Sequence, residues 1–174
     1  MLRKGTFFFS VLMMALWIAP VPCPFAQRQA DSSLEGLTSV HVRVQLKIES
    51  DTAASGITAG QLQNDSEALI GDAGLKIVPQ EEFDRLIGSR GYPIALFDLD
   101  AKIFKPGDAG FHVYQLNFKV RQVAYLARKP VVKFLAPTWE MTDFGTTDTL
   151  TLVRERVRNA VIQFIRDFKA ENPK

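Results

Sequence analysis

The residues from Thr38 to Glu49 follow a strict period of two. Aliphatic side chains alternate there with polar ones, the first set being Val40, Val42, Val44, Leu46 and Ile48 and the second His41, Arg43, Gln45, Lys47 and Glu49. Successive side chains of a strand point to opposite faces of its sheet, so the pattern predicts a strand with one buried and one wet face. A chain built around this strand must supply a second layer to cover the apolar face.

Two segments with helical spacing can supply that layer. Thr58 and Gln61 have the spacing of a capping box, at the start of a helix that we expect to end near Ala73, with Gly74 as its left-handed cap. The second helix is expected over 149–170, where apolar residues recur on one side. They are Val153, Val157, Ala160, Val161, Phe164, Ile165 and Phe168. Each helix is therefore predicted to lay one apolar stripe on the sheet.

Further strands are expected over 75–78, 94–104, 112–121 and 131–139, and the segment 138–148 is expected to be a loop. The element order is then strand, helix, four strands and helix. One wet face per strand and two one-sided helices predict an α+β fold. We expect a two-layer sandwich with a mostly antiparallel sheet of about five strands, two main helices on one face, and a single domain over 38–172.

The amino-terminal segment has the features of a secretion signal. Arg3 and Lys4 precede an apolar stretch over 7–19, and a proline-rich exit ends at Ala26. We therefore expect a signal peptide over 1–26, a flexible leader over 27–37, and export to the periplasm or the outside of the cell. The prolines make the apolar stretch too short for a membrane-spanning helix, which needs about 20 residues.

Cleavage of this signal would remove the single cysteine and two positive charges from the chain. Cys23 is the only cysteine and lies inside the signal, and the residues before it lack the small-residue box of lipoproteins. The whole chain has 21 Lys and Arg against 19 Asp and Glu, so loss of Arg3 and Lys4 leaves 19 of each. A near-neutral, thiol-free domain argues against disulfide, thiolate-metal and nucleic-acid functions.

Residues for catalysis are sparse. His41 is predicted on the wet face of its strand and His112 on the core-facing side of another, so the two histidines cannot share a site. No phosphate-binding loop, GxSxG or HExxH motif is present. We therefore expect neither an enzyme nor a cofactor.

Asp98 and Asp100 are the one pair of carboxylates that the strand pattern brings together. Alternate residues of a strand share a face, and such a pair can share a proton or hold a hard cation. Both residues can instead form cross-strand ion pairs with Arg43 and Lys47. We favour the ion pairs and keep Asp98 and Asp100 as weak candidates for a metal site.

Two surfaces are candidates for binding a partner. Trp139, Met141 and Phe144 lie close together in the expected loop, and aromatic and Met side chains are enriched in interface cores. These residues could equally fold back over the end of the sheet. The second candidate is the wet sheet face, where the cationic residues Arg43, Lys119 and Arg121 lie in the same phase as Asp98 and Asp100.

The order of elements resembles a known family. The segments SEALIGDAGLKIVPQEEF, HVYQLNFKVRQVAYLARKP and LVRERVRNAVIQFIRDF follow one another as in the amino-terminal domain of TolB and, more broadly, the CsgG-like periplasmic accessory domains. The resemblance implies a periplasmic domain that docks other envelope proteins. No β-propeller sequence follows, so Tol-system partners are not carried over, and no functional residue is transferred.

These observations together predict a non-catalytic, exported binding or accessory protein of the cell envelope. Its partner is expected to be another envelope protein, with no nucleic acid and no membrane span after signal cleavage. Two alternatives remain open: a small-ligand carrier with an apolar pocket between sheet and helices, and a carboxylate-based hydrolase that uses Asp98 and Asp100.

Overall fold

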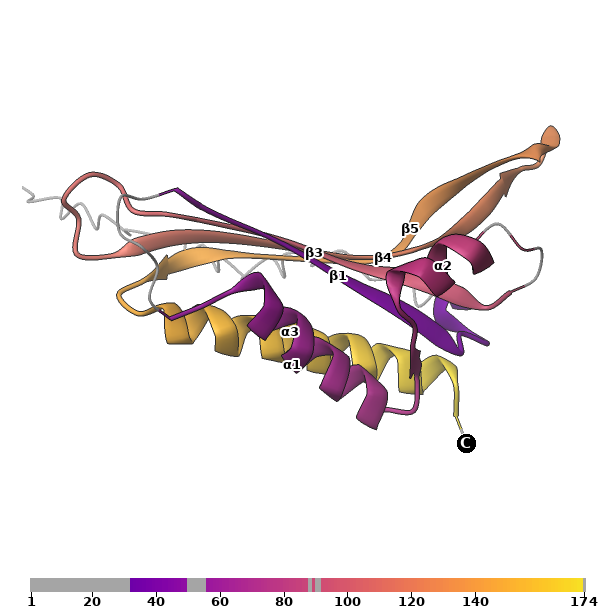
Figure 1. Cartoon of the computed structure of the whole chain (residues 1–174), viewed down its shortest axis with the longest axis horizontal. Helices are drawn as coiled ribbons and strands as arrows, with labels where there is room; N and C mark the ends of the chain where they lie inside the picture. The colour runs from indigo at the N-terminus through magenta and orange to yellow at the C-terminus, as the bar shows by residue number, and fades with distance from the viewer. Residues whose placement is uncertain (1–31, 50–55, 88, 90–91, 174) are drawn as a thin grey trace, which may run out of the picture.

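The structure is a computed structural model that describes residues 32–49, 56–87, 89 and 92–173. The expected signal peptide over 1–26 and Cys23 lie outside the described residues. A five-stranded sheet forms one layer, and its spatial order is β2-β1-β3-β4-β5 (Figure 1). The strands are β1 (Ser39–Glu49), β2 (Lys76–Ile77), β3 (Ile94–Phe104), β4 (His112–Leu126) and β5 (Lys129–Thr147).

The sheet is mixed. β1 pairs in parallel with both β2 and β3, whereas β4 pairs antiparallel with β3 and with β5. The parallel pairs follow from the connections, since β1 and β3 are separated by two helices and β2. The predicted α+β class and sandwich architecture are confirmed, with long antiparallel ladders only in the half of the sheet beyond β3.

Two helices form the second layer. α1 (Ala59–Asp72) and α3 (Leu150–Glu171) lie on the same face of the sheet (Figure 1). The predicted capping box at the start of α1 is present, because Gln61 N–H donates to Thr58 Oγ1 at 3.1 Å and Thr58 N–H donates to Gln61 Oε1 at 3.0 Å. Thr149 is the N-cap of α3, so the helix begins one residue after the expected start at 149.

Aromatic rings fill the space between the two layers. Phe164 of α3 is fully buried and contacts Phe97 of β3 and Trp139 of β5, with ring centroids 5.3 and 5.5 Å apart. Phe118 of β4 is also fully buried and lies 6.4 Å from Phe97. These side chains and the helical stripe predicted from the sequence pack as one core.

The opposite face of the sheet is covered at one end by α2 (Gln80–Leu86). Phe83 of α2 packs with Val78, Ile94 and Leu96 in a second, smaller apolar cluster. His41 was predicted to be wet, and this prediction is wrong: its ring lies 5.2 Å from that of Phe83, and its Nδ1 lies 2.9 Å from Val78 O. The strand phase of His41 was correct, but a helix distant in sequence covers that part of the face.

The segment 32–37 also packs on the body of the protein. It contains the short 3₁₀ helix η1 (Ser32–Leu34), and both Leu34 and Leu37 are buried. The Leu34 N–H donates to Glu171 Oε2 at 2.7 Å, at the end of α3. A flexible leader was expected over 27–37, but the described part of it is fixed to the carboxyl-terminal helix.

β5 is much longer than expected. The prediction of a loop over 138–148 is wrong, because β5 continues to Thr147 in register with β4. The ladder passes Gly145, which lies opposite Tyr114; a Cβ at this position would be 2.7 Å from the Tyr114 hydroxyl oxygen. Glycine therefore allows the strand to pass the buried tyrosine.

Candidate binding surfaces

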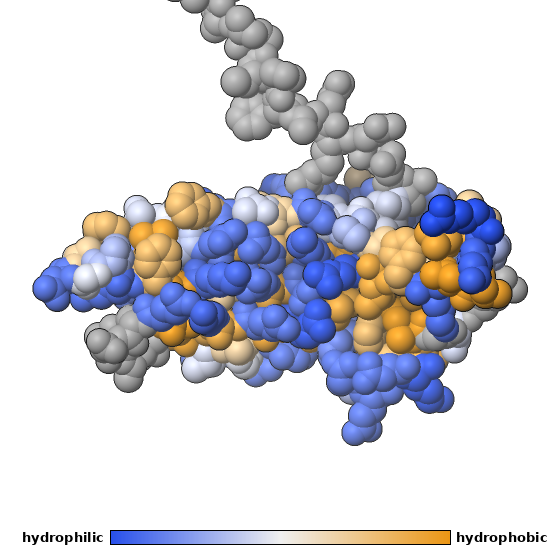
Figure 2. Space-filling view, turned by 90° about the horizontal axis from the view of Figure 1, so that it is seen from above, coloured by the Kyte–Doolittle hydropathy of each residue, from blue (hydrophilic) through white to orange (hydrophobic). Residues whose placement is uncertain are grey.

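On the side of the sheet away from α1 and α3, no helix or strand among the described residues covers the sheet beyond α2. We call this side the open face. It is lined by polar and charged side chains, namely Arg43, Gln45, Asp98, Asp100, Asn117, Lys119, Arg121, Glu140 and Thr142. The view onto the molecule from above shows a largely hydrophilic middle and apolar areas toward the end that carries α2 (Figure 2). The open face is thus a polar surface supported from below by the apolar core.

An ion cluster stands at the centre of the open face. Arg43 Nε and Nη2 donate to the two Asp98 oxygens, each at 2.9 Å, and Arg121 Nη2 lies 3.2 Å from Asp98 Oδ2. The three residues come from the adjacent strands β1, β3 and β4, and Arg43 lies directly opposite Asp98 in the register. The hydrogen bond with Asp98 raises the pKa of Arg43. The predicted cross-strand pair of Arg43 and Asp98 is confirmed.

The second predicted cross-strand pair does not form. Lys47 pairs with Glu49 on its own strand, and Asp100 lies 3.7 Å from Lys102 Nζ. Asp98 and Asp100 are therefore engaged by different cations, and both oxygens of Asp98 already accept guanidinium hydrogen bonds. Over the residues that the structure describes, no group of three or more His, Cys, Asp or Glu side chains could hold a metal ion.

The structure separates the three residues of the expected contact loop. Trp139 is buried, packs on Phe164 and donates from Nε1 to Asp167 Oδ2 at 2.7 Å. Met141 lies on the same side of β5 and packs partly against the core. Phe144 points the other way and is 70% exposed. The three side chains do not form one surface patch, and the placement of Trp139 favours core packing.

A surface that the sequence analysis missed lies at the far end of β4 and β5. The ladder shifts register between Val120 and Arg121, and beyond this bulge the two strands form a ribbon over residues 121–137. We call this ribbon the arm. It rises away from the helix layer (Figure 1). The bulge explains the change of direction, since an extra residue bends and twists a strand.

The arm exposes large apolar side chains. Val131 is 81% exposed and Phe134 is 47% exposed, and Tyr125, Val132 and Leu135 are also exposed. In the register, Ala124 lies opposite Phe134 and Val123 lies opposite Leu135, so apolar residues occupy both faces of the ribbon. Several exposed apolar side chains on one short ribbon make the arm a candidate contact site. The sequence already indicated this surface, because apolar residues occupy both the odd and the even positions of the strand over 131–136.

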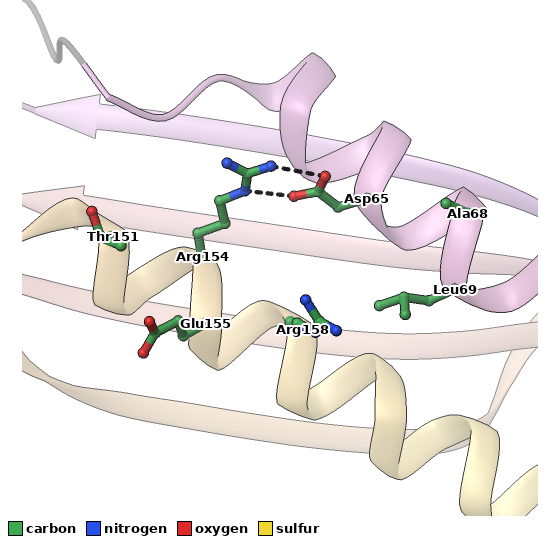
Figure 3. Close-up of a pocket in the computed structure, with 7 residues that line it drawn as sticks. All are labelled: Asp65, Ala68, Leu69, Thr151, Arg154, Glu155 and Arg158. Atoms are coloured by element: carbon green, nitrogen blue, oxygen red, sulfur yellow. Dashed lines mark hydrogen bonds and ion pairs between the residues drawn. The ribbon is translucent and has the colours of Figure 1, made fainter.

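A groove on the helix side is the third surface. It runs between α1 and α3 and is lined by Asp65, Ala68, Leu69, Thr151, Arg154, Glu155 and Arg158 (Figure 3). Arg154 Nε and Nη2 donate to the two Asp65 carboxylate oxygens at 2.6 and 2.9 Å across the groove (Figure 3). This hydrogen bonding lowers the pKa of Asp65. The pair joins the two helices at their solvent side.

No described helix is both long enough and apolar enough to cross a membrane. No family model matches the chain, and no curated protein matches it. Among solved structures, it is similar to the PelC dodecamer from Paraburkholderia phytofirmans, with 16% identity, a TM-score of 0.38, and coverage of 73% of this chain and 86% of that one.

It is also similar to the hypothetical protein CT253 from Chlamydia trachomatis, with 8% identity, a TM-score of 0.39, and coverage of 76% of this chain and 99% of that one. Likenesses at this level say nothing of what the chain binds. The resemblance to TolB and CsgG-like domains stays a prediction.

Proposed function

We propose that this protein is an exported, non-catalytic binding or accessory protein of the cell envelope, and that its open face contacts another envelope protein. The observation that carries the proposal is the uncovered sheet face with its ordered charge cluster. Arg43, Asp98 and Arg121 are fixed by one another across three strands. A rigid surface with charges of both signs selects a partner by complementary charge.

The architecture supports a surface of this kind. One side of the sheet is sealed by α1 and α3 over aromatic side chains, so the strands under the open face have little freedom to move. Lys119 and Glu140 lie opposite each other beside the central cluster, with Nζ and Oε1 3.8 Å apart and both side chains partly exposed. A partner can compete for these two charges at little cost, because exposed ion pairs contribute little stability.

Site-specific photo-crosslinking in the cells that export the protein tests this proposal. A photoreactive residue at Gln45, which is exposed on the open face, is expected to give a discrete protein adduct. The same residue at Arg166, which is exposed on α3, is the control and is expected to give none. Equal adducts from both positions, or no adduct from Gln45, would contradict a contact at the open face.

A charge reversal sharpens the test. Lys119→Glu places a second negative charge opposite Glu140, and we expect it to reduce the adduct from Gln45 several-fold with only a small decrease in melting temperature, since like charges opposite each other destabilise a sheet slightly. Lys169→Glu makes the same change of charge on an exposed position of α3 and should leave the adduct intact. If the two variants behave alike, net charge rather than the open face determines binding.

A further inference from the structure

The amino-acid composition of the arm indicates what kind of surface it contacts. From Gln122 to Trp139 the chain has three cationic residues and no acidic one, although acidic and basic residues are nearly balanced over the whole sequence. The tip carries Arg128 and Lys129, and both are exposed. The arm therefore combines exposed apolar side chains with a local excess of positive charge, which is the composition of segments that bind anionic membrane surfaces.

The distribution of the apolar residues distinguishes a lipid surface from a protein groove. A ribbon that docks on a protein needs one apolar face, while its other face remains wet. In the arm, Phe134 lies on one face opposite Ala124 and Leu135 lies on the other face opposite Val123, and both Phe134 and Leu135 are exposed. An environment that surrounds the ribbon satisfies both faces at once, and the boundary between lipid headgroups and acyl chains is such an environment.

Other features of the arm limit how deeply it can insert into a lipid bilayer. Two paired strands leave unpaired backbone N–H and C=O groups at their outer edges, and these groups are not satisfied within hydrocarbon. The cations at the tip also favour the headgroup level. The arm is thus suited to lie in the interface, with its apolar side chains about 5–10 Å into the headgroup and acyl boundary, and not to cross the bilayer.

We propose that the arm attaches the protein peripherally to an anionic lipid surface. The attachment uses the apolar side chains of both faces for partition and the tip cations Arg128 and Lys129 for attraction to negative headgroups. It goes beyond the proposed partner contact, because the open face and the arm are different surfaces of β4 and β5. A protein held by its arm keeps the polar open face available.

Vesicle flotation of the exported protein, purified from the cells that export it, tests the proposal. The wild-type protein is expected to float with vesicles of phosphatidylcholine and phosphatidylglycerol in equal parts, and much less with vesicles of phosphatidylcholine alone. Added salt should weaken the binding, because it screens the attraction. Variants carry the same amino-terminal segment as the wild type, so differences between them report on the arm.

Two double variants separate the apolar and the electrostatic contributions. Val131→Ser with Phe134→Ser should reduce binding to the anionic vesicles more than about tenfold, on the order of what loss of two partitioning side chains implies. Arg128→Gln with Lys129→Gln should reduce it on the order of twentyfold, since each cation near an anionic surface contributes about fivefold.

The matched controls are Phe144→Ser, which removes an exposed ring from the open face, and Arg166→Gln with Lys169→Gln, which removes two exposed charges from α3. Both should bind vesicles like the wild type, and all variants should melt like the wild type. Wild-type protein that fails to float with anionic vesicles overturns the proposal, as does an arm variant that binds as well as the controls.

If photo-crosslinking from Val131 in cells gives a protein adduct and vesicles are not bound, the arm docks on a protein and the lipid proposal is wrong. That outcome leaves the contact at the open face standing, because the Gln45 adduct tests it separately.

Discussion

The side chains of β4 are buried to different extents in the body of the protein and in the arm. Over residues 112–120 every second side chain is buried: Tyr114, Leu116, Phe118 and Val120 all pack in the core. Beyond the bulge after Val120 the same face of the strand continues with Gln122, Ala124 and Leu126, and none of these three is buried. The difference arises from the second layer, since α3 covers the first region and the arm projects from the sheet (Figure 1). A strand is buried by what packs on it, and an uncovered apolar strand indicates a partner.

The largest difference between body and arm is expected for one aromatic residue in each. Phe164→Ala removes a fully buried ring that contacts Phe97 and Trp139, and it should lower the free energy of unfolding by about 3–5 kcal/mol. Phe134→Ala in the arm should change it by no more than about 0.5 kcal/mol. Urea denaturation measures both, and similar losses would show that the arm is part of the folded core.

A medium effect is expected on the open face of the body. Asp98→Ala leaves Arg43 and Arg121 side by side without their carboxylate. Both arginines are partly exposed, so we expect a loss of about 1–3 kcal/mol, less than for a fully buried pair. Asp100→Ala, which removes only a long ion pair with Lys102, should stay within about 0.5 kcal/mol and serves as the control in the same denaturation series.

A smaller effect is expected when the arm is removed altogether. Replacing residues 123–135 by Asn-Gly joins the paired residues Gln122 and Ala136 through a two-residue turn. Because the deleted side chains are mostly exposed, the free energy of unfolding should change by less than about 1 kcal/mol. Thermal unfolding followed by circular dichroism checks this, and loss of cooperative folding would mean that the body depends on the arm.

The smallest effect concerns the link between α1 and α3. The pKa of Asp65 is lowered in the folded protein by Arg154, so the pair stabilises the fold above the unfolded pKa of Asp65, and this stabilisation is lost as the pH falls through the folded pKa. Arg154→Gln should therefore melt slightly below the wild type at about pH 7 and together with it at about pH 2. A difference in melting temperature between the variant and the wild type that grows as the pH falls would contradict a stabilising pair of Asp65 and Arg154.

Local patterns in the sequence were sufficient for much of the body. The alternation around Val42 gave the correct faces of β1, and the apolar stripe around Phe164 gave the buried side of α3. The capping residues Thr58 and Gln61 placed the start of α1. Each of these features depends on neighbours within one or two turns or on a period of two, so they can be recognised without tertiary structure.

The parts that escaped prediction depend on contacts between distant segments. His41 is buried because α2 returns over β1, and the strand pattern carries no trace of that return. Trp139 and Phe144 were assigned to one loop because turn-forming residues surround them, although Trp139 and Met141 already alternate with Glu140 and Thr142 as in a strand. The arm looked like ordinary sheet, because sequence alone does not show where the covering helices end.

Hydrogen exchange along β4 and β5, with and without anionic vesicles, tests the contrast between body and arm most directly. Amides of β4 over 113–120 should exchange slowly and independently of vesicles, since they lie between two paired strands above the core. Amides over 122–126 and 131–135 should exchange much faster in solution and become protected when vesicles of phosphatidylcholine and phosphatidylglycerol are added. An arm as protected in solution as the body, or one unaffected by the vesicles, would contradict the account.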